Sequence, residues 1–324
     1  MAFINNSSGH TGQYEFQSEI QIGIYIQKAE TFLFEYVFPV ILSLSSLWNL
    51  LIIIYFTKIN IKRIRKMSPY HFLLVQLAVA DFLVCSGMTF MDHYKRKPAW
   101  ELGVIGCRFF TVFQGVCPMA SFWLLVLLSY ARYRSITQPL KQRINKTKFS
   151  LACILIWFLT IALSSYLIFN TTLNTRRTGK TTCAFIISES SLLIFNGFRL
   201  ILDCILPITL VLSFYWKIKN GMAVDNAMNV FASTNQSRQR NQAALRTIES
   251  LVILFIVSVV PGRLIHILSS ILKYYNEVTQ PLFSQTLENY TDILKVVSDF
   301  FLFLNHTLNI FIYAKIMPGF RRFL

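Results

Sequence analysis

Seven apolar segments, each long enough to cross a lipid bilayer, dominate this sequence of 324 residues. A transmembrane helix needs roughly 20 mostly apolar residues. Backbone that faces lipid has to satisfy its own hydrogen bonds, so each segment is expected to be helical. The sequence therefore predicts an all-α membrane protein, built as a seven-transmembrane helix bundle. The seven segments span residues 32–57, 69–94, 105–135, 148–169, 190–217, 245–272 and 291–314.

The composition agrees with a membrane protein. Charged residues make up 14% of the chain and hydrophobic residues 54%, whereas soluble domains carry about 25% charged residues. The net charge of +16 would suggest nucleic-acid binding in a soluble protein. No polar stretch is long enough for such a domain, and cytoplasmic loops of membrane proteins collect Lys and Arg. We therefore expect membrane lipid around the bundle and no nucleic-acid partner.

Loop charges and sequons predict the orientation. With the N-terminus outside, the inner loops and tail hold more than twice as many Lys and Arg as the outer segments. We predict a multi-pass plasma-membrane protein with an extracellular segment at residues 1–31, the bundle at 32–314, and a short amphipathic helix at 315–324 on the inner membrane surface. Four outer sequons are predicted glycosylation sites, namely Asn5, Asn6, Asn170 and Asn289.

Polar residues interrupt the apolar segments at isolated positions. Asn49 follows Leu47 and Trp48 in the first segment, and Asp81 ends the run Leu77–Asp81 in the second. A carboxylate at membrane depth is costly unless it has partners or an ion. Taken alone, Asp81 indicates either a structural hydrogen bond or a functional site.

Landmark residues occur in order along all seven segments, and together they resemble those of rhodopsin-like (class A) G-protein-coupled receptors. The resemblance covers about residues 32–324. The matching positions are Asn49, Leu77–Asp81, Cys107, Ala131-Arg132-Tyr133, Pro139, Leu140, Trp157, Pro207, Tyr215, Phe255, Pro261, Asn305, Asn309 and Tyr313.

The resemblance implies a disulfide and an ion site. Cys107 and Cys183 would be bridged on the outer side, where conditions are oxidising; the alternative is two free thiols. A sodium pocket is implied, since hard cations prefer oxygen ligands; the alternative is a dry hydrogen-bond network among the same side chains. No other cofactor is expected. The implied sodium ligands are Asp81, Ser121, Asn305 and Asn309.

The resemblance also implies coupling to a heterotrimeric G protein, in which Arg132 moves between an inward state and one that contacts the G protein. Tyr215 and Tyr313 are implied to stabilise the second state through their hydroxyl groups. The residues implied in coupling and activation are Arg132, Tyr133, Pro139, Leu140, Tyr215 and Tyr313.

Three positions depart from the family pattern. Ala131 replaces the acidic residue that usually precedes the landmark Arg, residues 309–313 lack the usual Pro, and residues 258–261 lack the usual Trp. These departures leave the fold prediction intact. They bear on activation, and a receptor-like scaffold that does not signal stays an alternative.

The outer halves of the segments hold the candidate ligand site. Gln114 stands where amine receptors carry a carboxylate, and Phe303 stands where opsins carry the retinal-linking Lys. Six ionisable groups near one cavity must pair with each other or meet a ligand; internal salt bridges, such as Arg263 with Asp203 or Asp299, are the alternative. The candidate ligand-binding residues are Asp92, Gln114, Arg199, Asp203, Arg263, His266 and Asp299.

The segment Trp100–Gly103 resembles the first outer loop of many peptide receptors, and Gln114 is frequent in those. With the charged cavity, this favours a receptor for an extracellular peptide. The alternatives are a small anionic or lipid ligand, or a transporter that uses the intramembrane charges as a relay. Transporters usually show internal repeats, and none is detected here. No nucleophile, metal cluster or phosphate loop indicates an enzyme.

Overall fold

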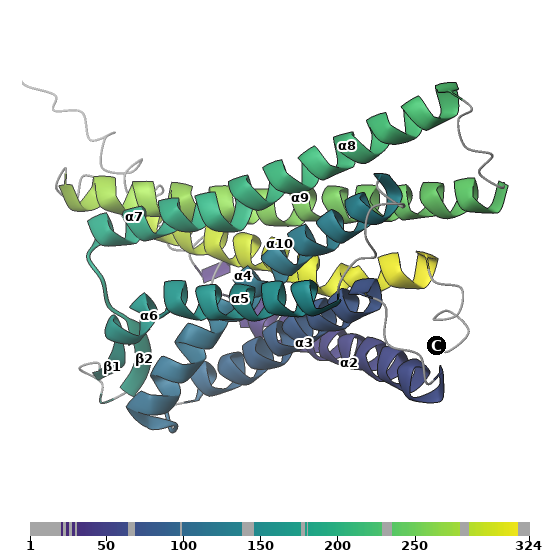
Figure 1. Cartoon of the computed structure of the whole chain (residues 1–324). Helices are drawn as coiled ribbons and strands as arrows, with labels where there is room; N and C mark the ends of the chain where they lie inside the picture. The colour runs from purple at the N-terminus through teal and green to yellow at the C-terminus, as the bar shows by residue number, and fades with distance from the viewer. Residues whose placement is uncertain are drawn as a thin grey trace, which may run out of the picture.

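The computed structural model describes residues 21, 24–25, 28–29, 31–63, 69–97, 99–137, 146–175, 179, 181–228, 235–278 and 285–316. Within these ranges the chain forms the seven predicted helical segments (Figure 1). Three of them are composite, because they contain a π-helical stretch or a short break. The elements are η1 (Leu33–Val37) with α2 (Phe38–Arg63), α3 (Pro69–Arg96), α4 (Gly103–Thr137), α5 (Lys146–Ser164) with α6 (Tyr166–Phe169), α7 (Glu189–Leu200) with η2 (Ile201–Ile205) and α8 (Leu206–Met228), α9 (Asn235–Val278) and α10 (Gln285–Ile316).

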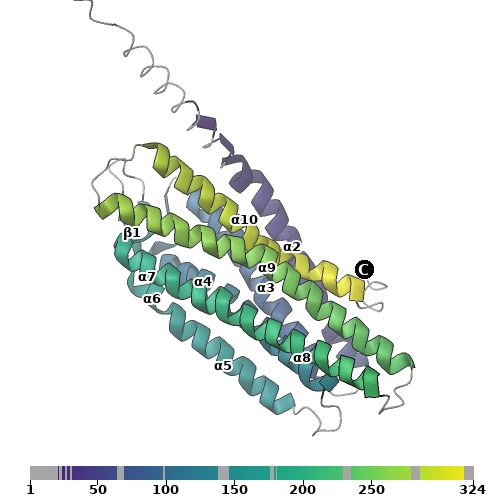
Figure 2. The same cartoon turned by 90° about the horizontal axis from the view of Figure 1, so that it is seen from above.

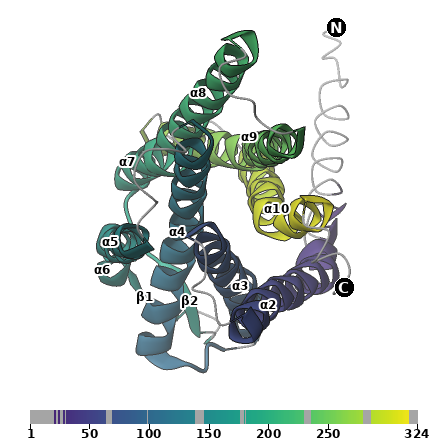
Figure 3. The ribbon, with the colours of Figure 1, turned by 45° about the vertical axis from the view of Figure 1, so that its right-hand side comes forward.

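The helices pack as a closed bundle (Figure 3). Helix α2 packs on α3, α3 on α4, and α4 on both α5 and α8. Helix α8 then packs on α9, and α10 lies between α9 and α2, as Figure 2 shows. This closure brings α10 beside α2 and α3, so residues from both ends of the chain share one interior.

Six of the seven segments are long and apolar enough to cross a membrane over their described residues; α10 falls short of that measure. Helix α10 carries polar residues at four positions along the bundle, namely Asp299, Asn305, His306 and Asn309. The last three of these side chains are buried. They face the bundle interior, which is where polar residues of a membrane helix are tolerated.

The helices extend further than the hydropathy predicts. Helix α9 begins at Asn235 rather than 245, and α10 begins at Gln285 rather than 291. Hydropathy marks the part of a helix inside the hydrocarbon core, whereas backbone hydrogen bonding continues into water. Asn289 consequently lies in α10 and not in a loop before it. Of the predicted inner-surface helix, residues 315 and 316 belong to α10, whereas 317–324 and the segment 1–20 lie outside the described residues.

A two-stranded antiparallel hairpin covers one end of the bundle, and the sequence did not predict it. Strand β1 (Thr171–Thr175) pairs with β2 (Thr181–Phe185), with Leu173 opposite Cys183. Cys183 is disulfide-bonded to Cys107 near the start of α4, with the two Cα atoms 5.5 Å apart. The structure thus contains the implied disulfide, and we call this end of the molecule the hairpin end.

Apolar side chains also cover much of the outside of the bundle. On α5, Leu151, Ile154, Leu155 and Phe158 are each more than half exposed. Water would not tolerate such a continuous apolar face on a monomer, whereas lipid tails do. The face of α5 therefore matches a bilayer environment.

Candidate functional site: a charged cavity and a buried carboxylate network

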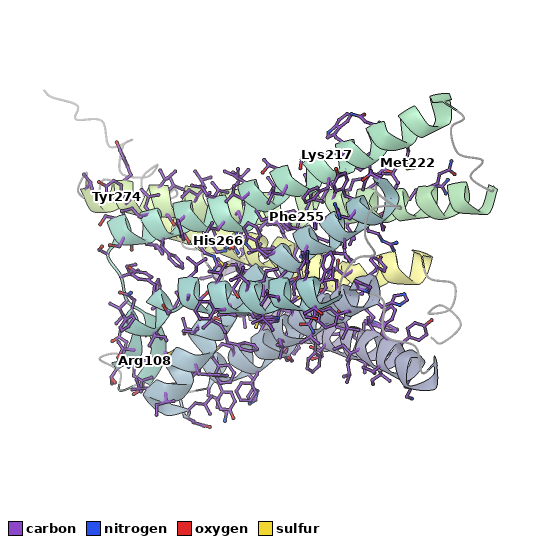
Figure 4. The ribbon with its side chains drawn as sticks, in the orientation of Figure 1. Arg108, Lys217, Met222, Phe255, His266 and Tyr274 are labelled. Carbon is purple, nitrogen blue, oxygen red and sulfur yellow. A yellow bond between two sulfur atoms is a disulfide. The ribbon has the colours of Figure 1, made fainter. Side chains whose placement is uncertain are left out.

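A cavity of about 150 Å³ opens inside the bundle towards the hairpin end. Helices α3, α4, α7, α9 and α10 all contribute to its wall. Figure 4 shows His266, one of the lining residues, on the hairpin side of Phe255 along α9. The cavity is lined by Val84, Met88, Gln114, Pro118, Phe122, Arg199, Arg263, His266, Asp299, Leu302, Phe303 and His306.

Two arginines of the cavity wall share one buried carboxylate. Arg199 Nε lies 2.5 Å from Asp203 Oδ2, and Arg263 Nη2 lies 2.7 Å from the same oxygen. Asp203 is fully buried and lies behind the wall rather than in it. Neither of its oxygens has a hydrogen-bond donor among the described residues, so the two contacts to Oδ2 are ion pairs by distance. This Arg199–Asp203–Arg263 cluster contains two cations and one anion, so it carries an excess positive charge.

The π-helical turn η2 lies between α7 and α8 and contains Asp203. Single π-turns within α-helices change the direction of the following side chains and occur often at functional sites. Arg199 and Asp203 are four residues apart, which places them on one face of the helix, and both are buried. Arg199 Nη1 also donates to the Gly115 carbonyl at 3.3 Å, which ties this helix to α4.

The cavity wall also carries a carboxylate, Asp299. His266 Nε2 lies 3.6 Å from Asp299 Oδ1, and both side chains are partly exposed. Gln114 donates its amide to the Met88 sulfur at 3.1 Å. Five of the seven predicted ligand residues therefore line one cavity. Asp203 supports them from behind, and the side chain of Asp92 is outside the described part of the chain.

Below the cavity, Asp81 is held by three donors from two helices. Ser121 Oγ of α4 donates to Oδ1 at 2.6 Å, and His306 Nδ1 of α10 lies 2.7 Å from the same oxygen. Asn309 Nδ2 donates to Oδ2 at 2.7 Å. All four side chains are buried. We call this the Asp81 network.

The side chains of the Asp81 network do not match a sodium site. The atoms that face the carboxylate are an N–H of Asn309, a ring nitrogen of His306 and the hydroxyl of Ser121. Sodium prefers oxygen ligands, and the His306 ring nitrogen lies beside Asp81 Oδ1 without supplying one. Asn305, the fourth implied ligand, accepts a hydrogen bond from Ser258 at 3.4 Å through its side-chain oxygen.

Phe122 connects the network to the cavity. Its ring stacks on His306 with the ring centres 5.8 Å apart, and it meets Phe255 edge-on at 5.2 Å. Phe122 and His306 both line the cavity floor. Val259, at the position where the family carries Trp, is fully buried. Aromatic contact between α4, α9 and α10 is thus made by Phe122 in place of a Trp.

Arg132 lies at the opposite end of α4, which we call the Arg132 end. Its guanidinium carbon lies 3.2 Å from the centre of the Tyr70 ring, at the start of α3. Among the described side chains, no carboxylate lies within ion-pair distance of Arg132. A cation–π contact with Tyr70 therefore replaces the usual charge pairing.

The other residues implied in coupling are only partly described. Tyr133 stacks on Phe214 of α8 with the ring centres 5.8 Å apart, and Tyr215 is half-buried beside them. Figure 4 places Lys217 and Met222 further along α8 towards the Arg132 end. Pro139, Leu140 and the side chain of Tyr313 lie outside the described residues.

Comparison with known proteins supports the class that this architecture suggests. The family model "7 transmembrane receptor (rhodopsin family)" matches residues 48–313. The chain belongs to this family, the class A G-protein-coupled receptors.

Relatives within the family bind different ligands, as their names state. A dopamine D2-like receptor of Drosophila melanogaster is 27% identical over 54% of this chain and 18% of its own length. The tachykinin-like peptides receptor 86C of the same species is 31% identical over 29% of this chain and 19% of its own length. The N-arachidonyl glycine receptor of Rattus norvegicus is 25% identical over 47% of each chain. Each match spans less than half of the relative's length.

Reasoning from the sequence did not identify three residues of these sites. His306 had a usable signal, because a histidine inside an apolar helix is a site candidate in itself. Phe122 and Tyr70 had none, since aromatic residues are common in such segments. Their roles depend on which helix faces them.

Proposed function

We propose that this protein is a plasma-membrane receptor that binds an extracellular peptide in the cavity at the hairpin end and activates heterotrimeric G proteins at the Arg132 end. One observation carries the proposal: the cavity presents both charge signs in a small volume. Arg199 and Arg263 supply positive charge, and Asp299 supplies negative charge in the same wall. A peptide terminus carries one charge, and a side chain next to it can carry the opposite one.

The size of the cavity supports a ligand that inserts only one part. Pockets for whole drug-sized ligands measure roughly 300–1,000 Å³, whereas this one holds about 150 Å³. A peptide terminus or side chain fits that volume while the remainder contacts the hairpin. The tachykinin-like peptides receptor among the relatives agrees with this class of ligand.

An amine ligand is less well supported, although dopamine receptors are among the relatives. The position of the amine-binding carboxylate is occupied by Gln114, whose amide contacts Met88. A cationic amine would have no counter-charge there, and it would face Arg199 and Arg263 in the same cavity.

A second candidate is an acidic lipid. It is supported by the excess positive charge of the Arg199–Asp203–Arg263 cluster and by the similarity to the N-arachidonyl glycine receptor. The cavity would then hold the acidic headgroup.

The proposed orientation rests on two features. The disulfide at the hairpin end suits an oxidising compartment, and Lys and Arg are concentrated at the other end. Asn170, partly exposed between α6 and β1, lies at the hairpin end and is available for glycosylation. Asn5, Asn6 and Asn289 remain proposed sites on the same side.

The test is a peptide-library screen in cells that report activation of each G-protein class. Arg132→Ala at matched surface expression serves as the signalling-dead control. Activation by a peptide, lost in Arg132→Ala, supports the proposal. Activation by acidic lipids alone favours the second candidate, and a silent receptor with every ligand class favours the non-signalling scaffold.

A further inference from the structure

His306 occupies the side of Asp81 where the family pattern implies a cation. Its Nδ1 lies 2.7 Å from Asp81 Oδ1, a hydrogen-bonding distance. A carboxylate only accepts hydrogen bonds, so the facing nitrogen is a donor, whether the ring is neutral or charged. The same oxygen also accepts from Ser121 at 2.6 Å, and Asn309 donates to the other oxygen.

These three donors consume most of the carboxylate's capacity. Two carboxylate oxygens offer about four lone-pair sites, and a bound cation needs several of them together with other oxygens. The Ser121 hydroxyl and the Asn309 amide both direct protons at Asp81. The Ser121 hydroxyl and the Asn309 amide each also contain an oxygen, so His306 is the neighbour of Asp81 that offers a cation no oxygen ligand.

The imidazole is also held in place by its surroundings. His306 is only 2% exposed, and its ring stacks on Phe122. Its backbone carbonyl accepts a hydrogen bond from Asn49 Nδ2 at 3.3 Å, which fixes α10 against α2. The ring is therefore packed against Phe122, which lines the same cavity.

We propose that the His306 side chain replaces the sodium ion at Asp81, so that sodium does not bind there and does not alter the conformational equilibrium of this receptor. The inference rests on the geometry of the Asp81 network and holds whichever extracellular ligand the receptor binds. A smaller side chain at position 306 would reopen the space and leave Asp81 able to coordinate a cation.

The experiment measures thermal unfolding of the purified full chain in NaCl and in N-methylglucamine chloride at equal ionic strength. A thiol-reactive dye reports unfolding through the four buried free cysteines. The wild type is expected to show the same Tm in both salts. His306→Ser is expected to gain a sodium-specific rise of about 2–4 °C, because an ion that binds only the folded state stabilises it.

Two controls make the result specific. Adding Asp81→Asn to His306→Ser removes the gained response, since the anionic ligand is lost. His266→Ser makes the same substitution at a histidine whose partner is Asp299 rather than Asp81. This variant is expected to show no sodium-specific rise in Tm.

A sodium-specific rise in the wild-type Tm would overturn the proposal. So would a His306→Ser variant that folds but does not respond to sodium, because another group would then block the site. If His306→Ser does not yield folded protein, His306→Ala with radioactive sodium binding to membranes, compared with wild type, decides the same question.

Discussion

The Arg199–Asp203–Arg263 cluster and the Asp81 network each surround one fully buried carboxylate, yet their partners differ. Asp203 is paired with two permanent cations, both at the same oxygen. Asp81 receives hydrogen bonds from a serine, an asparagine and a histidine, at both of its oxygens. Neither carboxylate lines the cavity itself: the first cluster borders it through its arginines, and the Asp81 network borders it through His306.

The difference suggests separate roles. An excess of permanent positive charge inside a membrane protein is costly unless a further anion is supplied, so the first cluster is suited to receive a ligand. The Asp81 network is already satisfied by its own side chains. It is suited to join α3, α4 and α10, and His306 with Phe122 lets the cavity floor contact it directly.

The largest expected effect separates the two carboxylates. Asp203→Asn leaves two buried guanidiniums without their counter-charge and is expected to cost about 3–5 kcal/mol of stability. Asp81→Asn, whose partners are mainly uncharged donors, is expected to cost about 1–3 kcal/mol. Thermal unfolding of both purified variants measures the ranking. Equal losses of stability would show that the charged partners of Asp203 contribute no more than the uncharged partners of Asp81.

Loss of the disulfide is expected to loosen the hairpin end first. Cys183→Ser frees β2 from α4 and should cost about 2–5 kcal/mol, with reduced surface expression. Trp100 should become more exposed in this variant, because it packs against the bridge. Non-reducing peptide mapping of the surface-expressed wild type should show Cys107 and Cys183 linked, and two free thiols there would contradict the structure.

Arg263→Ala tests whether the excess positive charge of the Arg199–Asp203–Arg263 cluster contributes to ligand binding. Asp203 keeps Arg199 as its partner in this variant, so surface expression should stay near normal. Agonist potency should fall at least tenfold, equivalent to about 1.4 kcal/mol. Arg199→Ala is the matched control, and it should lower expression as well, because Arg199 also bonds the Gly115 carbonyl. Normal potency in Arg263→Ala would remove the arginine from the ligand site.

The smallest expected effect concerns ligand-free signalling at the Arg132 end. Ala131 gives Arg132 no adjacent counter-charge, and Tyr70 supplies a cation–π contact worth about 0.5–2 kcal/mol. We expect basal activity above that of Arg132→Ala, and Ala131→Asp should lower it several-fold, since about 1.4 kcal/mol of bias shifts the two states tenfold. A reporter assay at matched surface expression measures it. Wild-type basal activity no higher than that of Arg132→Ala would refute the prediction.

Tyr70 offers a control for the same assay. Tyr70→Phe keeps the ring under Arg132 and should leave basal activity unchanged. Tyr70→Leu removes the aromatic face and should raise it. Identical behaviour of the two variants would show that the cation–π contact does not restrain Arg132.

The sequence by itself determined the membrane class, the seven helical segments and five of the residues that line the cavity. Apolar length is a local property, so it is readable without a structure. Charged residues inside such segments must face the bundle interior, which is why Gln114, Arg199, Arg263, His266 and Asp299 could be grouped before their positions were known.

Only the tertiary structure decided which of these groups are partners. Arg263 pairs with Asp203, although Asp299 was an equal candidate, and His306 meets Asp81 across 225 positions of sequence. These contacts depend on how each helix is rotated about its axis, and the π-turn η2 alters that rotation just where Asp203 lies. Hydropathy carries no information on rotation when a helix is apolar all round, so packing between distant helices fixes the pairs.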